Sequence, residues 1–231
     1  TPVAYVVLFY FLLLTGFNFY SAVSLLNRAP GDVSLVEAFF NTVIFWFTYI
    51  LIFPLITMRA YAEEFRMGTV EPLTTAPVRD VQVVLAKFAG SVFFYCVLWV
   101  PSALCFLGFR WIAGESAEGA AGSWPGAYAM LLLLGLFYLS IGHLASVVTK
   151  DQINAAVIAF SVISLVFFTG LVTFLVPSSS PYFQELVRYF SALEHMADFS
   201  RGIVDTKPVA YYLSMTAFVL FLVYHVFQSR K

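Results

Sequence analysis

Apolar residues fall into six long runs along the chain, with short polar stretches between them. The runs cover about residues 3–26, 39–57, 81–109, 127–148, 153–176 and 209–227. A helix needs about 20 apolar residues to cross the hydrocarbon core of a bilayer, so each run predicts one transmembrane helix. No linker composition divides the chain. We therefore expect one all-α membrane domain over residues 1–231, with six transmembrane helices.

The polar stretches predict caps and shorter helices. "SLVE", from Ser34 to Glu37, has the pattern of a capping box and should open the second helix, which then runs to about Thr57. Between the fifth and sixth runs, two short amphipathic helices are expected within about residues 181–205. Ser180 and Pro181 are suited to the start of the first of them, and the second passes through "EHMADFSRGIVD".

Composition supports a membrane protein and argues against nucleic acid as a partner. The chain is 61% hydrophobic and only 11% charged, whereas about a quarter of the residues of a soluble domain are charged. Its net charge is -1 and it has no basic run, although a nucleic-acid-binding surface needs concentrated positive charge. The expected surroundings are therefore a lipid bilayer.

The loop charges set the expected orientation. An even number of spans places both termini on the same side of the membrane. The loops on that side carry seven basic and five acidic residues, and the loops on the other side carry five basic and eight acidic residues. Because basic residues are concentrated on the cytoplasmic side, both termini are expected to be cytoplasmic, and the two short helices between spans five and six should lie outside.

No catalytic, cofactor-binding or metal-binding motif is recognisable. The HExxH, GxSxG and GxxxxGK[ST] patterns are absent. Polar residues within or beside the spans are Thr15, Asn18 and Asn41, which are candidates for helix packing or for a substrate pathway. An unpaired amide in hydrocarbon is costly, so the face that carries Asn18 should contact protein or a cavity.

The stretch from Glu63 to Asp80 concentrates charge, glycine and proline between two spans. The second helix should continue past the bilayer with an Arg59–Glu63 pair on one face, and Gly68 should end it. A short helix over about residues 68–76 follows, with Glu71 in its first turn. This helix could rest on lipid headgroups or contact a cytoplasmic partner, and the residues alone leave both open.

The sequence "EEFRMGTVEPLTTAPVRDVQVVLAKF" resembles the inward loop of ABC-2-type ABC transporter permeases. The stretch "GHLASVVTKDQINAAVIAF" is similar to the turn between the fourth and fifth spans of that family, and both ends of the chain resemble its GldF and NosY-like subgroup. Pro72 departs from the family pattern, which usually has an aliphatic residue there. The positions that match the loop pattern are Glu64, Arg66, Gly68, Thr69, Glu71, Leu73, Pro77 and Lys87.

The resemblance implies a non-catalytic permease subunit of an ATP-driven transporter, most simply an exporter, in a bacterial cytoplasmic (inner) membrane. It implies a dimer with an identical or related permease subunit and two copies of an ABC ATPase, which would bind ATP and magnesium. The helix from Gly68 to Ala76 would be the coupling helix that contacts the ATPase. An alternative is a membrane anchor that recruits an ATPase without transport, as in a gliding-motility machinery. The implied coupling residues are Glu63, Glu64, Arg66, Gly68, Thr69, Glu71, Leu73 and Pro77.

Overall fold

The computed structural model describes residues 2–28, 34–69, 79–114, 123–175 and 189–230. Within these ranges every regular element is a helix, and six helical segments are long and apolar enough to cross a membrane. This confirms the predicted all-α fold with six spans. The spans are formed by α1 (Pro2–Arg28), α3 with α4 (Val43–Thr57 and Ala62–Met67), α6 (Asp80–Ala113), α7 (Ser123–Val148), α8 (Gln152–Leu175) and α11 (Thr206–Ser229).

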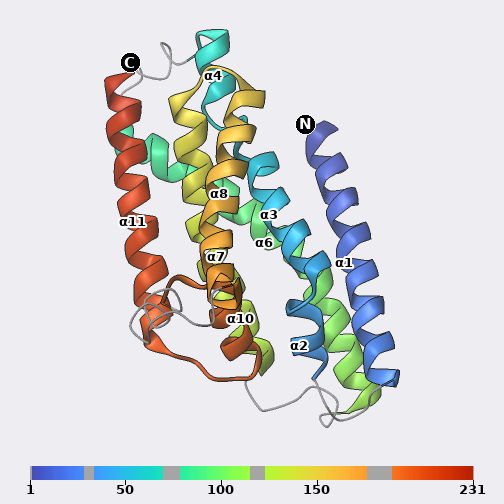
Figure 1. The fold of residues 1–231 in the computed structure, drawn as a ribbon. Coiled ribbons are helices and arrows are strands. Elements are labelled where there is room, and N and C mark those ends of the chain that lie inside the picture. Colours follow the sequence, from blue (N-terminus) through green and yellow to red (C-terminus); the bar gives the residue numbers. More distant parts are fainter. Residues whose placement is uncertain (1, 29–33, 70–78, 115–122, 176–188, 231) are drawn as a thin grey trace.

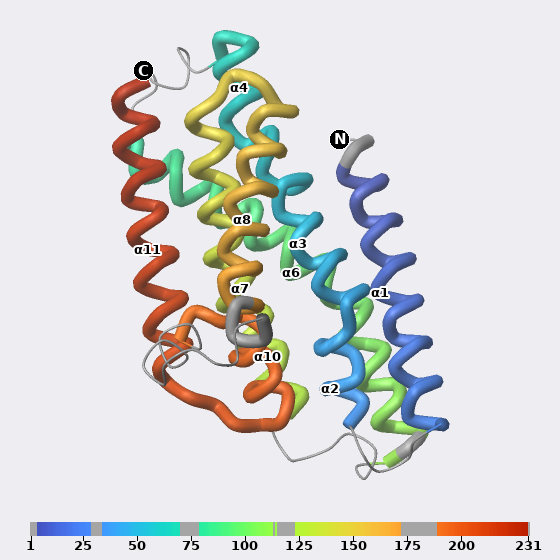
Figure 2. The backbone as a smooth tube through the Cα atoms, in the orientation of Figure 1, coloured from blue at the N-terminus to red at the C-terminus, as the bar shows by residue number. Residues whose placement is uncertain are grey.

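Both termini lie at the same end of the bundle, which we call the termini end (Figure 1). Helix α4 also lies there, whereas the short helices α2 (Leu35–Phe40) and α10 (Ala192–Ser200) lie at the opposite end. Helix α7 is the centre of the bundle and is mostly buried, with α8, α10 and α11 packed around it. Helix α6 runs obliquely from the neighbourhood of α11 to that of α1, as the tube in Figure 2 shows.

Aromatic side chains and close helix contacts hold the interior together. The hydroxyls of Tyr49 and Tyr95 both donate to the Leu131 carbonyl of α7, at 3.0 and 2.8 Å. This pairing matters because a buried tyrosine hydroxyl needs a partner. At Gly142 of α7, an added Cβ would lie 2.2 Å from Oγ1 of Thr57. The absent side chain therefore lets α7 approach the end of α3 closely, as small residues do in membrane helix pairs.

The capping box at Ser34 is confirmed, but the helix that it opens is short. The side chain of Ser34 accepts from the Glu37 N–H, and α2 then ends at Phe40. The expectation of one helix to Thr57 is wrong, because α3 begins anew at Val43 with Thr42 as its N-cap.

A side chain from α1 takes the place of the helical hydrogen bonds at this break. The amide of Asn18 donates to the carbonyl of Phe39 at 3.0 Å, and the hydroxyl of Thr42 donates to Oδ1 of Asn18 at 2.6 Å. The exposed Asn41 is the C-cap of α2. Because the partner that stabilises the break lies more than twenty residues earlier in the chain, the local pattern did not reveal it.

One of the two short helices predicted between spans five and six is present in the described residues. The predicted second helix corresponds to α10, which Ser191 caps and a turn at Gly202 follows, with φ at 83°. The end of α10 is tied to α2 by an ion pair between Arg201 and Glu37, with Nε and Oε1 2.7 Å apart. The predicted first helix, from Ser180, begins outside the described residues.

Candidate functional site

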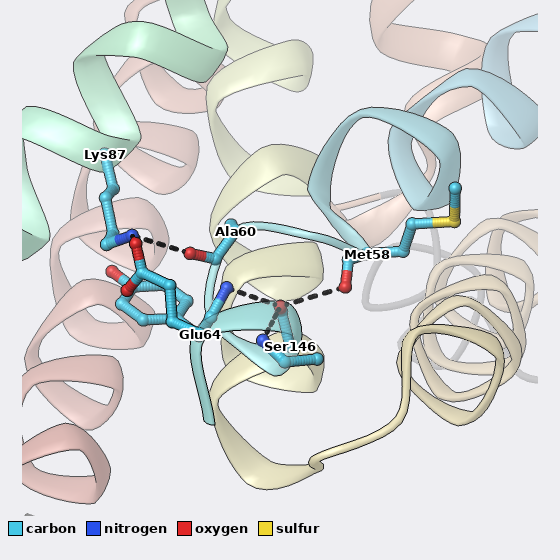
Figure 3. A network of polar contacts seen from close by, with 7 residues as sticks. Met58, Ala60, Glu64, Lys87 and Ser146 are labelled. Atoms are coloured by element: carbon cyan, nitrogen blue, oxygen red, sulfur yellow. Dashed lines mark hydrogen bonds and ion pairs between the residues drawn. The ribbon is translucent and has the colours of Figure 1, made fainter. Parts of the chain in front are cut away.

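At the termini end the second span is interrupted between Thr57 and Ala62. The helix predicted to continue through "MRAYAEEFRM" is therefore broken, and α4 starts only after the turn. The hydroxyl of Ser146, on α7, accepts from the N–H groups of Tyr61 and Ala62 at 3.0 and 3.2 Å. It donates to the carbonyl of Met58 at 3.3 Å, as Figure 3 shows. One serine hydroxyl thus uses two acceptor positions and its one donor on the same turn.

A lysine from a third helix completes this turn. Lys87 lies two turns into α6, and its ammonium group donates to the Ala60 carbonyl at 2.8 Å and to Oε1 of Glu64 at 2.5 Å (Figure 3). Its side chain is 19% exposed and that of Glu64 is 29% exposed. Both charges are therefore largely withdrawn from solvent and compensate each other, and hydrogen bonds between charged groups are among the stronger ones. We call the turn with Ser146, Lys87 and Glu64 the α3–α4 joint.

Apolar and aromatic contacts fix α4 against the helices behind it. Tyr61 is fully buried, with its ring edge-on to His143 of α7 at 5.6 Å. Nε2 of His143 is in turn 2.9 Å from the Ser91 hydroxyl of α6. The buried residues of this layer are Tyr61, Val83, Val84, Val147, Val223 and Phe227.

The last span also reaches the joint. The guanidinium group of Arg230 lies 4.8 Å from the ring centroid of Phe65 on α4, and it donates to the Val147 carbonyl of α7 at 2.5 Å. Phe227 contacts the rings of both Tyr61 and Phe65. The α4 helix is thus held by α6, α7 and α11, and it also packs against α8.

The residues implied in ATPase coupling divide into those near the joint and those beyond it. Glu64 belongs to the joint, while Oε2 of Glu63 lies 4.0 Å from Nε of Arg59, the pair predicted from their spacing. Nε of Arg59 also donates to Gln152 of α8 at 3.2 Å. Arg66 is exposed on α4.

Gly68 ends α4, as predicted. Its φ is 69°, in the left-handed region where glycine has no steric cost. Its N–H and that of Thr69 both donate to the Glu64 carbonyl. The chain therefore turns sharply away from α4 at this point. Glu71, Leu73 and Pro77, and with them most of the predicted coupling helix, lie outside the described residues.

The polar residues predicted for packing or a pathway do not form one site. The Thr15 hydroxyl donates to the Phe11 carbonyl of its own helix at 2.7 Å. Asn18 is 1% exposed and holds the α2–α3 break, and Asn41 is exposed at the end of α2. Sequence reasoning missed Ser146, whose only signal was its place among small residues in "GHLASVV".

The joint can transmit force, but its groups do not suggest a cofactor site. Among the residues that the structure describes, no group of three His, Cys, Asp or Glu side chains could hold a metal ion.

A family model described as "ABC-2 family transporter protein" matches residues 26–193, well over half of the chain. The matched region begins near the end of α1 and ends in α10, so it includes the whole α3–α4 joint. No curated protein matches.

Proposed function

The chain belongs to the ABC-2 family of transporter proteins, and from this premise we propose that it is the permease subunit of an ATP-driven exporter. Two permease subunits, identical or related, form the translocation path, and two cytoplasmic ABC ATPase subunits bind ATP and magnesium and drive it. Both termini and α4 face the cytoplasm of a bacterial cell, and the chain lies in its inner membrane. The subunit itself carries no catalytic residue.

The observation that carries this proposal is the α3–α4 joint. The segment from Gly68 to Ala76, the proposed coupling helix, follows directly on α4. A displacement of this segment by an ATPase acts on α4, which has few internal hydrogen bonds of its own because it is only six residues long.

The contacts of α4 determine where the displacement goes. Ser146 ties the joint to α7, and Lys87 ties it to α6. Since the backbone groups of the turn that meet Ser146 and Lys87 are already paired, a push on α4 is passed to α6 and α7 more readily than it is absorbed by loosening the turn. Movement of these helices would open and close the path between two permease subunits.

The proposal is tested by purifying the tagged full-length chain from its own membrane in a mild detergent. We expect an ABC ATPase to co-purify, with ATP hydrolysis in the eluate. A Glu71→Ala/Leu73→Ala double variant should insert normally but lose most of this ATPase. The matched control is Asp198→Ala/Ile203→Ala, which removes one acid and one apolar side chain, both exposed at the opposite end of the bundle.

Unchanged recovery of the ATPase and unchanged hydrolysis in the Glu71→Ala/Leu73→Ala variant would refute the proposed coupling helix. An ATPase that co-purifies but hydrolyses ATP at the same rate with and without the permease would favour the anchoring role over transport.

A further inference from the structure

A cleft of about 420 Å³ opens beside the α3–α4 joint, between α1, the end of α3, α4 and α6. In Figure 1 the first turns of α1 stand apart from α3 and α4 at this end of the bundle. The cleft is within the range of about 300–1,000 Å³ that is usual for small-molecule sites. Ser146 is not among the described residues that line it.

The walls of the cleft change character along the bundle. The charged side chains come from the last turn before α4, from α4 itself and from Lys87, all near the termini end. Apolar side chains about one turn before the joint on α3, and two turns beyond Lys87 on α6, lie farther from that end. The first turns of α1, which begin at the termini end, add two more apolar side chains. These apolar residues are Ala4, Val7, Leu55, Ile56 and Phe94.

The charged side chains that line the cleft near the termini end are of both signs, and some of their polar atoms make no hydrogen bond to the described part of the protein. Glu64 accepts from Lys87 through Oε1, while its Oε2 is buried and has no hydrogen-bond partner in the part of the chain that the structure describes. The Arg59 side chain is 36% exposed and that of Glu63 is 31% exposed, and Nε of Arg59 lies 4.0 Å from Oε2 of Glu63, too far for a hydrogen bond. Nε of Arg59 is used by Gln152, at 3.2 Å, so an anion in the cleft would meet the terminal amino groups of the guanidinium. The cleft can therefore take both an anionic and a cationic group.

These features together restrict the ligand. A wholly apolar molecule would remove water from four charged side chains without replacing its hydrogen bonds, which is costly. A small polar solute would leave the apolar walls unfilled. An anionic headgroup without an amine would face Glu63 and Glu64 with like charge. An amphiphile with a phosphate and a primary ammonium avoids all three penalties.

We propose that the cleft binds the headgroup and first methylene groups of a zwitterionic phospholipid of the phosphatidylethanolamine type. Its phosphate is placed at Arg59 and its ammonium group at Glu63, whose side chain is 31% exposed. The acyl chains extend past Val7 and Phe94 and along the lipid-facing surface of α1, where Tyr5 and Phe9 are exposed. This site does not depend on the proposed transport function, since either a bilayer lipid or a transported lipid has the required chemistry.

The test uses the full-length chain in lipid nanodiscs that contain a trace of photoactivatable phosphatidylethanolamine, with its diazirine near the glycerol end of an acyl chain. Peptide mapping should place cross-links on residues 55–60 and 90–94, which line the cleft. A phosphatidylglycerol probe with the same diazirine should label these peptides several-fold less.

Two substitutions separate the headgroup contacts. Arg59→Gln should reduce labelling by both probes about fivefold, the effect of losing one half-exposed charge contact. Glu63→Gln should reduce labelling by the phosphatidylethanolamine probe only, so the ratio of phosphatidylethanolamine labelling to phosphatidylglycerol labelling should fall. The matched controls are Lys150→Gln and Asp151→Asn, which remove exposed charges at the same end of the bundle from residues that do not line the cleft, and neither should change labelling.

Equal labelling of all lipid-facing helices, or no effect of Arg59→Gln, would overturn the proposed site. Equal labelling of the cleft by both probes would overturn the zwitterionic headgroup. Because these experiments need no ATPase, their failure would leave the co-purification result untouched. In the co-purified complex, cleft labelling that falls when ATP is added identifies a transported lipid, and labelling that ATP does not change identifies a resident one.

Discussion

Replacing Ser146 by alanine tests the α3–α4 joint most directly. The substitution removes a hydroxyl that accepts from two buried N–H groups, those of Tyr61 and Ala62, and donates to the Met58 carbonyl. It adds no volume, so no steric strain accompanies it. Each buried donor left without a partner costs about 1–3 kcal/mol. We therefore expect the joint to lose roughly 2–4 kcal/mol, allowing for partial rescue by water at this end of the bundle.

Amide hydrogen exchange measures this loss locally. A peptide that covers residues 58–67 reports the opening of the turn and of α4. Because each 1.4 kcal/mol is a factor of ten, a loss of 2–4 kcal/mol should speed exchange there roughly 30- to 700-fold. Exchange in α10, at the opposite end of the bundle, should stay nearly constant.

Ser140→Ala is the matched control. Ser140 is equally buried on α7, but its hydroxyl donates only back to the Phe137 carbonyl of the same helix, at 2.7 Å. Its loss leaves no N–H group without a partner, so exchange in residues 58–67 should not change. If Ser146→Ala and Ser140→Ala gave the same exchange in that peptide, the role assigned to Ser146 would be refuted.

Two further predictions concern ion pairs. Lys87→Met should destabilise the protein by about 3–5 kcal/mol, because it leaves the Glu64 carboxylate without its cation. The double variant Lys87→Met/Glu64→Gln should recover most of the lost thermal stability, as measured by its melting temperature. A double variant that is no more stable than Lys87→Met would contradict this. For Glu37, burial alone would raise the pKa, but the hydrogen bonds from Arg201 and Ser34 together hold it below its ordinary value of 4.5. The pair therefore stabilises the fold above about pH 4.5 and ceases to do so as the pH falls through the lowered pKa. Since Arg201 is 58% exposed, the effect should be at most about 1 kcal/mol. Melting temperatures of the wild type and Arg201→Gln should differ at pH 7 and converge as the pH is lowered below 4.5, whereas a constant difference would argue against the assignment.

The features that could be predicted from sequence are those that depend on neighbouring residues. Run length alone gives six spans, Ser34 and Glu37 form their capping box within one turn, and Gly68 ends α4 because only its own φ is involved. The two breaks in the second span could not be predicted in this way. At each break the hydrogen bonds of a continuous helix are replaced by a side chain from elsewhere, Asn18 at one end and Ser146 at the other.

In the candidate site, too, local features could be predicted from the sequence and contacts between distant residues could not. The pattern around Glu64 and Gly68 marked the right region, and the Arg59–Glu63 spacing gave a real contact. The pairing of Glu64 with Lys87 depends on how α6 crosses α4, since 23 residues separate them. A spacing of that size carries no local signal.

The two breaks make α3 unusual among the six spans. It has 15 residues, which at 1.5 Å per residue gives about 22 Å, less than the hydrocarbon thickness of about 30 Å. At least one of the two breaks must then lie in hydrocarbon, where a backbone group without a partner costs several kcal/mol. The side chains that replace the helical hydrogen bonds are therefore required for α3 to exist as a separate rod. Because those side chains belong to α1 at one end and to α6 and α7 at the other, α3 cannot shift along its axis without disturbing three helices at once. Because α3 is short and is hydrogen-bonded to neighbouring helices at both ends, it is well suited to carry a displacement of α4 across the membrane to α1 and α2.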